Sequence, residues 1–455
     1  MNLSTIAHDM RSSILSKGHL PLYARKKKLE ALKKVIVKKE TLINKALKDD
    51  LGKSSFESYA TEVGFILEEI NFTLKNIDNW AKPKKVKTPF TLFPGKSYVH
   101  SEPYGVVLII SPWNYPFQLC LSPFIGAFAA GNKIVLKPSE YASHTSRAIK
   151  EILQEVFNES EVVVVEGALE ETQVLLKQQF DYIFFTGSTM VGKVIMKAAA
   201  ENLTPVTLEL GGKSPCLIEE SANLDVAAKR CAWGKFLNAG QTCVAPDYIL
   251  VPEHLQDKFI GMMKVHLKGF YGEDSLKSED YPRIINEKHF DRLEKLISHE
   301  KVAIGGRTSR QESFIEPTVL KDVSWNDLIM EDEIFGPILP VIPYQNVTEA
   351  LNMILTRPKP LAFYIFSENE KRKNEIISKV PFGGGCVNDT VVHLANPNLP
   401  FGGVGTSGLG SYHGKKSFET FTHHKSVYEQ GTLVDIPLRY PPYAGKLNWL
   451  KFFIR

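Results

Sequence analysis

Four short apolar runs decide the fold of this chain: GVVLIISP at residues 105–112, KIVLKPS at 133–139, EVVVVEG at 161–167 and DYIFFTGS at 181–188. Helical patterns separate them. Strands that alternate with helices predict βαβ units and a parallel sheet covered on both faces. Such sheets bind ligands in the loops after their strands, which here read SPWNYP, KPSE, TGSTMVG and ELGGKSP.

A second α/β series follows Gly211. Its apolar runs are SPCLIEE, YILVP, PILPVIPY, LAFYIFS and PFGGGCVND. Before both series, the first 80 residues show helical patterns at 25–48 and 58–80, and the proline-containing segment 82–103 then predicts a hairpin or an extended arm. The sequence therefore predicts two Rossmann-like α/β domains with a small β arm.

Composition narrows the class of protein. The chain has 455 residues with 43% hydrophobic and 23% charged residues, which is typical of a soluble protein of two or more domains. A net charge of +4 is too small on this length to indicate a nucleic-acid partner. The five cysteines are odd in number and form no CxxC pair, so we expect no disulfide framework, no metal site and a reducing compartment. With no signal peptide and no long apolar run, we predict a cytoplasmic protein.

One cysteine differs from the others in its setting. Cys243 lies in GQTCVAPDY, between a polar lead-in and Pro246, a composition typical of the end of a helix and a loop. A thiol that can be reached there is a candidate nucleophile, and an inert thiol is the alternative. Glu209, at the end of a strand, is a candidate base, or a surface glutamate. Asn114 offers an amide donor in a rigid turn, or is a turn asparagine.

Two glycine-containing motifs are similar to phosphate-binding sequences. TGSTMVG joins a strand to a helix and forms a candidate anion site, although Gly187 and Gly192 do not match GxGxxG. A tight turn with a capped helix is the alternative. GGKS is not a P-loop, because Thr207 stands where that motif needs a glycine. His423 and His424 have no further ligand cluster and predict no metal site.

Taken together, the motifs resemble one family. PWNYP, KPSE, FTGSTMVG, LELGGKSP, GQTCVAPDY and EIFGP occur in the order and approximate spacing of the aldehyde dehydrogenases. The ending GTSGLGSYHGKKSFETFTHHKSV, the short N-terminus and LRYPPY resemble the class 3 branch, which includes fatty aldehyde dehydrogenases. The resemblance covers about residues 1–445.

The resemblance implies oxidation of an aldehyde to a carboxylic acid through a thiohemiacetal and a thioester. Cys243 would be the nucleophile, Asn114 and the Cys243 backbone N–H would hold the oxyanion, and Glu209 would activate water. The cofactor would be NAD, with NADP as the alternative. Its implied contacts are Trp113, Lys137, Glu140, Gly187, Ser188, Gly192, Glu333 and Phe335. Class 3 similarity implies medium- or long-chain aliphatic, or aromatic, aldehydes. An acylating, coenzyme A-dependent enzyme and a non-catalytic protein on the same fold are the alternative functions.

The same resemblance suggests a division of the chain. The expected parts are a cofactor domain at 1–85 plus 103–211, a catalytic domain at 212–400, oligomerisation segments at 86–102 plus 422–436, and a tail at 437–455. We expect a homodimer joined through the arm segments. The apolar tail is expected to pack on its own chain, and the substrate entrance of a partner subunit or a membrane surface are the alternatives.

Overall fold

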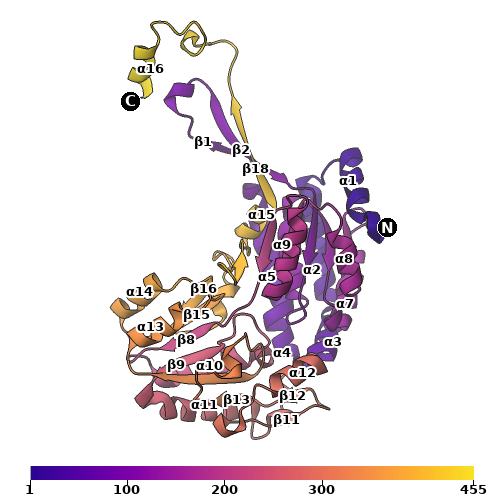
Figure 1. The fold of residues 1–455 in the computed structure, drawn as a ribbon. Helices are drawn as coiled ribbons and strands as arrows, with labels where there is room; N and C mark the ends of the chain where they lie inside the picture. The colour runs from indigo at the N-terminus through magenta and orange to yellow at the C-terminus, as the bar shows by residue number, and fades with distance from the viewer. Residues whose placement is uncertain (1, 455) are drawn as a thin grey trace.

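The computed structural model describes residues 2–454, except for the side chain of Phe453. Two α/β domains lie side by side, and a long β arm projects from them (Figure 1). We call the part built on the six-stranded sheet the first domain and the part built on the seven-stranded sheet the second domain. The predicted α/β fold with two sheets and an arm is confirmed.

The first domain contains the four runs that open the sequence analysis. Its sheet has the order β17-β7-β6-β3-β4-β5, with five parallel strands and an antiparallel edge strand, β17. The strands are β3 Val106–Ile110, β4 Lys133–Lys137, β5 Val162–Val164, β6 Tyr182–Thr186, β7 Val206–Glu209 and β17 Gly408–Leu409.

Helices cover both faces of this sheet, and this explains why its strands are apolar throughout. Val107 and Ile109 of β3 face one core, shared with α2, α5, α6 and α7, whereas Val106, Leu108 and Ile110 face a second core, shared with α1, α8 and α9. The helices are α1 Ile6–Lys17, α2 Leu22–Lys38, α3 Glu40–Leu51, α4 Ser55–Ser58, α5 Gly64–Trp80, α6 Gln118–Ala130, α7 Ser143–Gln154, α8 Leu169–Leu176, α9 Thr189–Ala200 and α15 Lys415–Thr420.

The second domain repeats the architecture. Its sheet has the order β10-β13-β14-β9-β8-β15-β16 and is parallel except for the edge strand β10. The strands are β8 Pro215–Ile218, β9 Tyr248–Pro252, β10 Val302–Ile304, β13 Thr318–Leu320, β14 Ile338–Tyr344, β15 Ala362–Phe366 and β16 Gly384–Val387, and a hairpin is formed by β11 Thr308–Ser309 and β12 Phe314–Ile315. The helices are α10 Leu224–Phe236, α11 Gln256–Tyr271, α12 Glu287–Glu294, α13 Val347–Leu355 and α14 Glu370–Lys379.

The arm is a three-stranded antiparallel sheet of β1 Lys84–Val86, β2 Lys96–Pro103 and β18 Thr422–Glu429. Residues from opposite ends of the chain meet here, from Thr422 opposite Pro103 to Glu429 opposite Lys96. The first arm strand begins at Lys84, two residues before the expected oligomerisation segment 86–102. Most of β18 is exposed and it forms an edge of the sheet, which leaves its outer backbone groups open for pairing.

Two expectations are wrong. The helical pattern at 25–48 is two helices, because the chain turns at Lys39, and a periodic pattern does not register such a turn. The tail does not bury its apolar side chains on its own chain: in α16 Leu447–Ile454, Trp449 is 64% exposed and Ile454 65%. Residues 430–446 connect β18 to α16, and α16 lies beside the tip of the arm, away from both domain cores (Figure 1). Arg455 lies outside the described residues.

Candidate active site

The site lies where the strands of the first domain end. Parallel strands place their carboxyl ends at one edge of the sheet. The loop after β3 carries Trp113 and Asn114, β4 ends at Lys137, Gly187 follows β6, and β7 ends at Glu209. These residues therefore lie at the same edge. The second domain faces this edge and supplies Cys243 and Glu333. The predicted residues therefore come from distant parts of the sequence to the interface of the two domains.

Cys243 stands just after a strained turn. The helix α10 ends at Phe236, and Asn238 and Ala239 then take left-handed backbone conformations with φ of 51° each. The thiol is half-buried. Burial, and then the carboxylates of Glu333 and Glu209, raise the pKa of Cys243 to about 12, although backbone N–H groups around the sulfur oppose the shift. The resting thiol is therefore protonated, and a base or a bound ligand must activate it.

Asn114 is held by the loop that carries the cysteine. Its Nδ2 donates to the carbonyl oxygen of Gln241 at 3.0 Å. The backbone carbonyl oxygen of Asn114 accepts from Asn238 Nδ2 at 2.7 Å and from Lys53 Nζ at 3.3 Å. The side-chain amide is thereby fixed beside the cysteine loop, where its second N–H can serve a developing oxyanion.

Glu209 is a buried carboxyl group that forms no ion pair with the described residues. Its side chain is 2% exposed, and neither oxygen has a hydrogen-bond partner within residues 2–454. Burial raises the pKa of Glu209 well above its ordinary value of 4.5. The negative charge of an ionised Glu209 also raises the pKa of Cys243 and of Tyr412. A carboxyl group whose pKa is raised accepts a proton more readily than an ordinary glutamate, which is what a general base requires.

An aromatic and acidic cluster lies on the other side of the cysteine. Trp113 meets Phe335 edge-on at 5.3 Å between ring centroids. Burial and the neighbouring Asp247 raise the pKa of Glu333 to about 8, and the Gly212 backbone N–H donates to it. A side chain at Gly211 is excluded, because its Cβ would lie 1.9 Å from Glu333 Oε2. This close approach explains Gly211, whereas Gly212 has room for a Cβ but takes a φ of 157°.

The remaining predicted cofactor residues lie further along the edge. Lys137 is buried, and its Nζ donates to the carbonyl oxygens of Gly167 at 2.7 Å and Pro138 at 3.0 Å. Glu140 lies 3.9 Å from the same ammonium and is 40% exposed. Ser188 caps α9 by accepting from the Val191 N–H.

These features fit a dinucleotide. The start of α9 offers backbone N–H groups to a pyrophosphate, and Gly192 packs so closely that a Cβ would meet Leu210 at 2.6 Å. The Thr186 hydroxyl, at the end of β6, is buried without a partner in the described part of the chain.

The structure adds residues that the sequence did not indicate. The ring of His289 of α12 is tilted against Trp113, with 4.8 Å between ring centroids, and burial lowers the pKa of His289 to about 4, so the imidazole is neutral. Arg292, one turn on, donates to the Ile334 carbonyl oxygen at 2.7 Å. Tyr412 is fully buried and lies within electrostatic reach of Glu209 and Cys243. Each contacts partners that lie far from it in the sequence, so no local signal marks these contacts, although Tyr412 lies within the ending GTSGLGSYHGKKSFETFTHHKSV.

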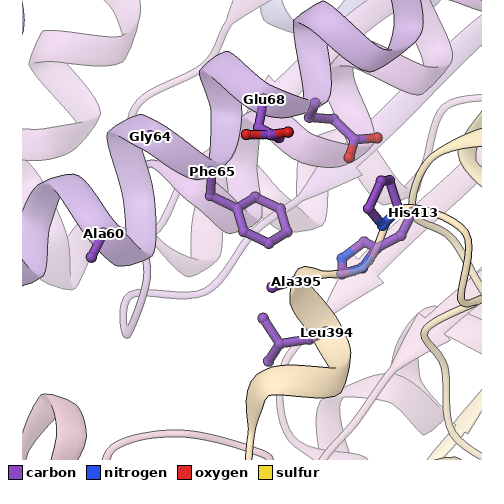
Figure 2. Close-up of a pocket in the computed structure, with 9 residues that line it drawn as sticks. Ala60, Gly64, Phe65, Glu68, Leu394, Ala395 and His413 are labelled. Atoms are coloured by element: carbon purple, nitrogen blue, oxygen red, sulfur yellow. The ribbon is translucent and has the colours of Figure 1, made fainter.

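A cavity of about 200 Å³ opens beside Tyr412. In Figure 2, Ala60, Gly64, Phe65 and Glu68 on one helical segment face Leu394, Ala395 and His413 across it. The ring of His413 meets Tyr412 edge-on, with 4.3 Å between ring centroids, and stacks on Phe401 at 5.1 Å. Both ring nitrogens of His413 are buried without a partner among the described residues. The lining combines apolar side chains with the carboxyl groups of Glu68 and Glu69 and the ring of His413.

The described residues form no disulfide, no metal-binding cluster and no membrane-spanning helix. All five cysteines are free thiols. Residues 2–454 contain no group of three or more His, Cys, Asp or Glu side chains arranged to hold a metal ion. No helix in this range is both long and apolar enough to cross a membrane.

Comparisons with known proteins agree with this geometry. A model of the aldehyde dehydrogenase family matches residues 7–427. The 4,4'-diaponeurosporen-aldehyde dehydrogenase of Staphylococcus aureus is 51% identical over 95% of this chain and 94% of its own. The dimeric NADP-preferring aldehyde dehydrogenase of Mus musculus is 46% identical over 98% of this chain and 99% of its own. A solved structure of the substrate-bound state of Staphylococcus aureus AldH is 48% identical, with a TM-score of 0.98 and full coverage of both chains. The chain therefore belongs to the aldehyde dehydrogenase family and catalyses NAD(P)-dependent oxidation of an aldehyde.

Proposed function

We propose that the oxidation proceeds through covalent catalysis at Cys243. The observation that carries this proposal is the convergence of a half-buried thiol, a fixed amide donor and an unpartnered buried carboxylate at one point between the domains. The Cys243 thiol gives up its proton to a base, for which Glu209 is the candidate, and its sulfur attacks the aldehyde carbon. The Asn114 side-chain amide with the Cys243 backbone N–H stabilises the oxyanion of the resulting thiohemiacetal.

When bound, NAD(P) would accept the hydride from the thiohemiacetal carbon, and this loss of hydride leaves a thioester on Cys243. The residues that would hold the cofactor are Trp113, Lys137, Glu140, Gly187, Ser188, Gly192, Glu333 and Phe335. Glu209 then takes a proton from a water molecule, whose oxygen attacks the thioester and releases the carboxylic acid. The presence of this base favours hydrolysis over transfer of the acyl group to coenzyme A, a transfer that does not need a water-activating carboxylate.

The substrate is a medium- or long-chain aliphatic, or an aromatic, aldehyde. The cavity beside Tyr412 supports this proposal, because Phe65, Leu394 and Pro397 give it apolar walls. A relative named for a diaponeurosporen aldehyde supports it as well. Each methylene buried in such walls adds up to ~0.8 kcal/mol of binding free energy.

NAD is the preferred cofactor, with NADP as the second choice. The half-exposed carboxylate of Glu140 repels a 2′-phosphate, while Lys137 attracts it. The Lys137 ammonium donates to two backbone carbonyl oxygens, which leaves it less available to a phosphate than a free lysine. The Mus musculus relative is named as NADP-preferring, so the rates with NAD and with NADP need to be compared directly.

The active form is a homodimer joined through the arm. Strand β18 supports this, because its exposed edge can pair with a second copy, and the Mus musculus relative is named as dimeric. The exposed tail then contacts the partner subunit, and a membrane surface is the alternative. Light scattering at micromolar concentration tests the assembly, and a mass of one subunit would contradict it. A cytoplasmic location stays a prediction.

An aldehyde panel tests the function. The purified protein is incubated with NAD or NADP and aldehydes of increasing chain length, together with an aromatic aldehyde. Reduced cofactor is followed by absorbance, and acid and acyl-coenzyme A are quantified separately. We expect acid as the product, a lower KM for longer chains and faster turnover with NAD. A product that forms only with coenzyme A would contradict the role of Glu209.

A further inference from the structure

We propose that Glu57 is a positioning residue for the reaction at Cys243, a role that rests on the function proposed above. It lies on α4 of the first domain and is 7% exposed. Its carboxylate holds the left-handed turn that presents the nucleophile from the second domain, so the catalytic loop takes its shape only when the two domains are in contact.

The turn needs an external support. Asn238 and Ala239 are consecutive residues other than glycine with φ of 51°, a conformation that side chains with a Cβ rarely adopt. Ala239 has no side-chain polar group that could stabilise it there. Such a conformation persists only when surrounding contacts enforce it.

Glu57 supplies that support. The backbone N–H of Asn238 donates to Glu57 Oε1 at 3.0 Å, although the two residues are 181 positions apart in sequence. With its backbone fixed, Asn238 donates through Nδ2 to the carbonyl oxygen of Asn114 at 2.7 Å and to that of Gln241 at 3.2 Å. One carboxylate thus fixes the residue that connects the oxyanion amide to the cysteine loop.

A buried ion pair supports the other side of the same junction. Lys53 Nζ lies 2.5 Å from Glu62 Oε1, and both side chains are fully buried. Glu62 Oε2 accepts from the backbone N–H of Phe117 at 2.8 Å, just after the Asn114 turn. The same ammonium lies 4.0 Å from the ring centroid of Tyr115, whose hydroxyl meets Thr242 Oγ1 at 2.7 Å.

The charges around Glu57 favour its ionised form only in part. Burial raises the pKa of Glu57 to about 7, Lys53 and the Asn238 N–H lower it, and Glu62 and Asp280 raise it further. Tyr115 and Tyr271 face it as well. From neutral pH upward the bond to Asn238 is therefore charge-assisted, which roughly doubles its strength over a neutral bond.

Substitution of Glu57 tests the role. Glu57→Ala removes the acceptor, and we expect kcat for aldehyde oxidation to fall by about 10- to 100-fold, with KM and NAD binding nearly unchanged, because the thiol and the amide lose their mutual alignment. Glu57→Gln keeps an oxygen acceptor and should retain kcat within about threefold. Site-resolved alkylation of Cys243 by iodoacetamide, followed by mass spectrometry, should change in rate in the alanine variant only.

A second substitution separates positioning from stability. Ala239→Gly places a residue that accepts φ of 51° without strain, so in the Glu57→Ala background it should restore part of kcat. The matched control is Glu219→Ala, which removes a carboxylate that is equally buried but pairs with Ser221 and Ser367. We expect this control to keep its kcat. If Glu57→Ala does not fold, Glu57→Asp with the same glycine rescue takes its place.

Three results would overturn the proposal. A Glu57→Ala enzyme with wild-type kcat would show that the turn holds itself. Equal losses of kcat in the Glu57 and Glu219 variants, or no gain from Ala239→Gly, would reduce Glu57 to a contributor to stability. Cys243→Ala is measured in parallel: if it is inactive, these results refute the positioning role alone, whereas an active Cys243→Ala refutes the proposed mechanism and the positioning role together.

Discussion

Replacing Glu209 by glutamine should separate the two halves of the reaction. The carboxylate has no hydrogen-bond partner within residues 2–454, and Glu333, the other carboxyl group near Cys243, already accepts the Gly212 N–H. No neighbour is therefore placed to take over the proton from water. General base catalysis contributes about 10²- to 10⁴-fold, so we expect a fall of that size in steady-state kcat, or about 3–5 kcal/mol at about 1.4 kcal/mol per decade.

The dependence on pH follows from burial. Because burial raises the pKa of Glu209, the carboxyl group is protonated and inactive at low pH, and wild-type kcat should rise as pH increases through that pKa. Stability runs the other way. The raised folded-state pKa gives a contribution to stability that is complete below the unfolded value near 4.5 and is lost as pH rises through the folded value. The glutamine variant should show neither change, and should gain stability over the wild type at alkaline pH.

Rapid-mixing kinetics with mass spectrometry is the appropriate assay. Glu209→Gln should release a burst of reduced cofactor and then stop, with an acyl group retained on Cys243. A smaller burst would show that Glu209 also helps to deprotonate the thiol, whose own pKa is about 12. Steady-state turnover equal to that of the wild type, at any pH, would remove Glu209 from the mechanism.

Three further predictions concern the nucleophile, the buried pair and the tail. Cys243→Ala should abolish oxidation and leave NAD binding intact by fluorescence titration; oxidation that persists would refute covalent catalysis. Lys53→Met should lower the free energy of unfolding by about 3–5 kcal/mol, because Glu62 then keeps an uncompensated buried charge, and Lys53→Met with Glu62→Gln should recover part of the loss in urea unfolding. Deleting residues 446–455 should raise KM more for long-chain than for short-chain aldehydes; equal effects at every chain length would count against a tail at the substrate entrance.

The sequence identified much of this site because its signals are local. The apolar runs predict parallel strands, since a strand buried on both faces must be apolar at every position. The motifs at the strand ends then fall at one edge of the sheet, as the positions of Asn114, Lys137, Gly187 and Glu209 show. The position of Cys243 after a helix is likewise visible in the composition around it.

Other errors and gaps have a common origin. The break at Lys39 and the exposure of α16 were not predicted, because an apolar pattern states that a face is buried and does not state against what. The contact of His289 with Trp113 involves single side chains with no periodicity, and the cavity lined by His413 brings together residues that are far apart in the sequence.

The sequence by itself determined the α/β architecture and indicated the candidate reacting groups, because the signals for both are residues that are close together along the chain. Only the tertiary structure decided the protonation states and alignment of those groups. The thiol of Cys243 and the carboxyl group of Glu209 have raised pKa values because the two domains remove them from water, and Asn238 keeps its strained conformation because Glu57 reaches it across the domain interface. Desolvation and hydrogen bonding depend on which distant residues meet in space, and that is set by the packing of the whole chain.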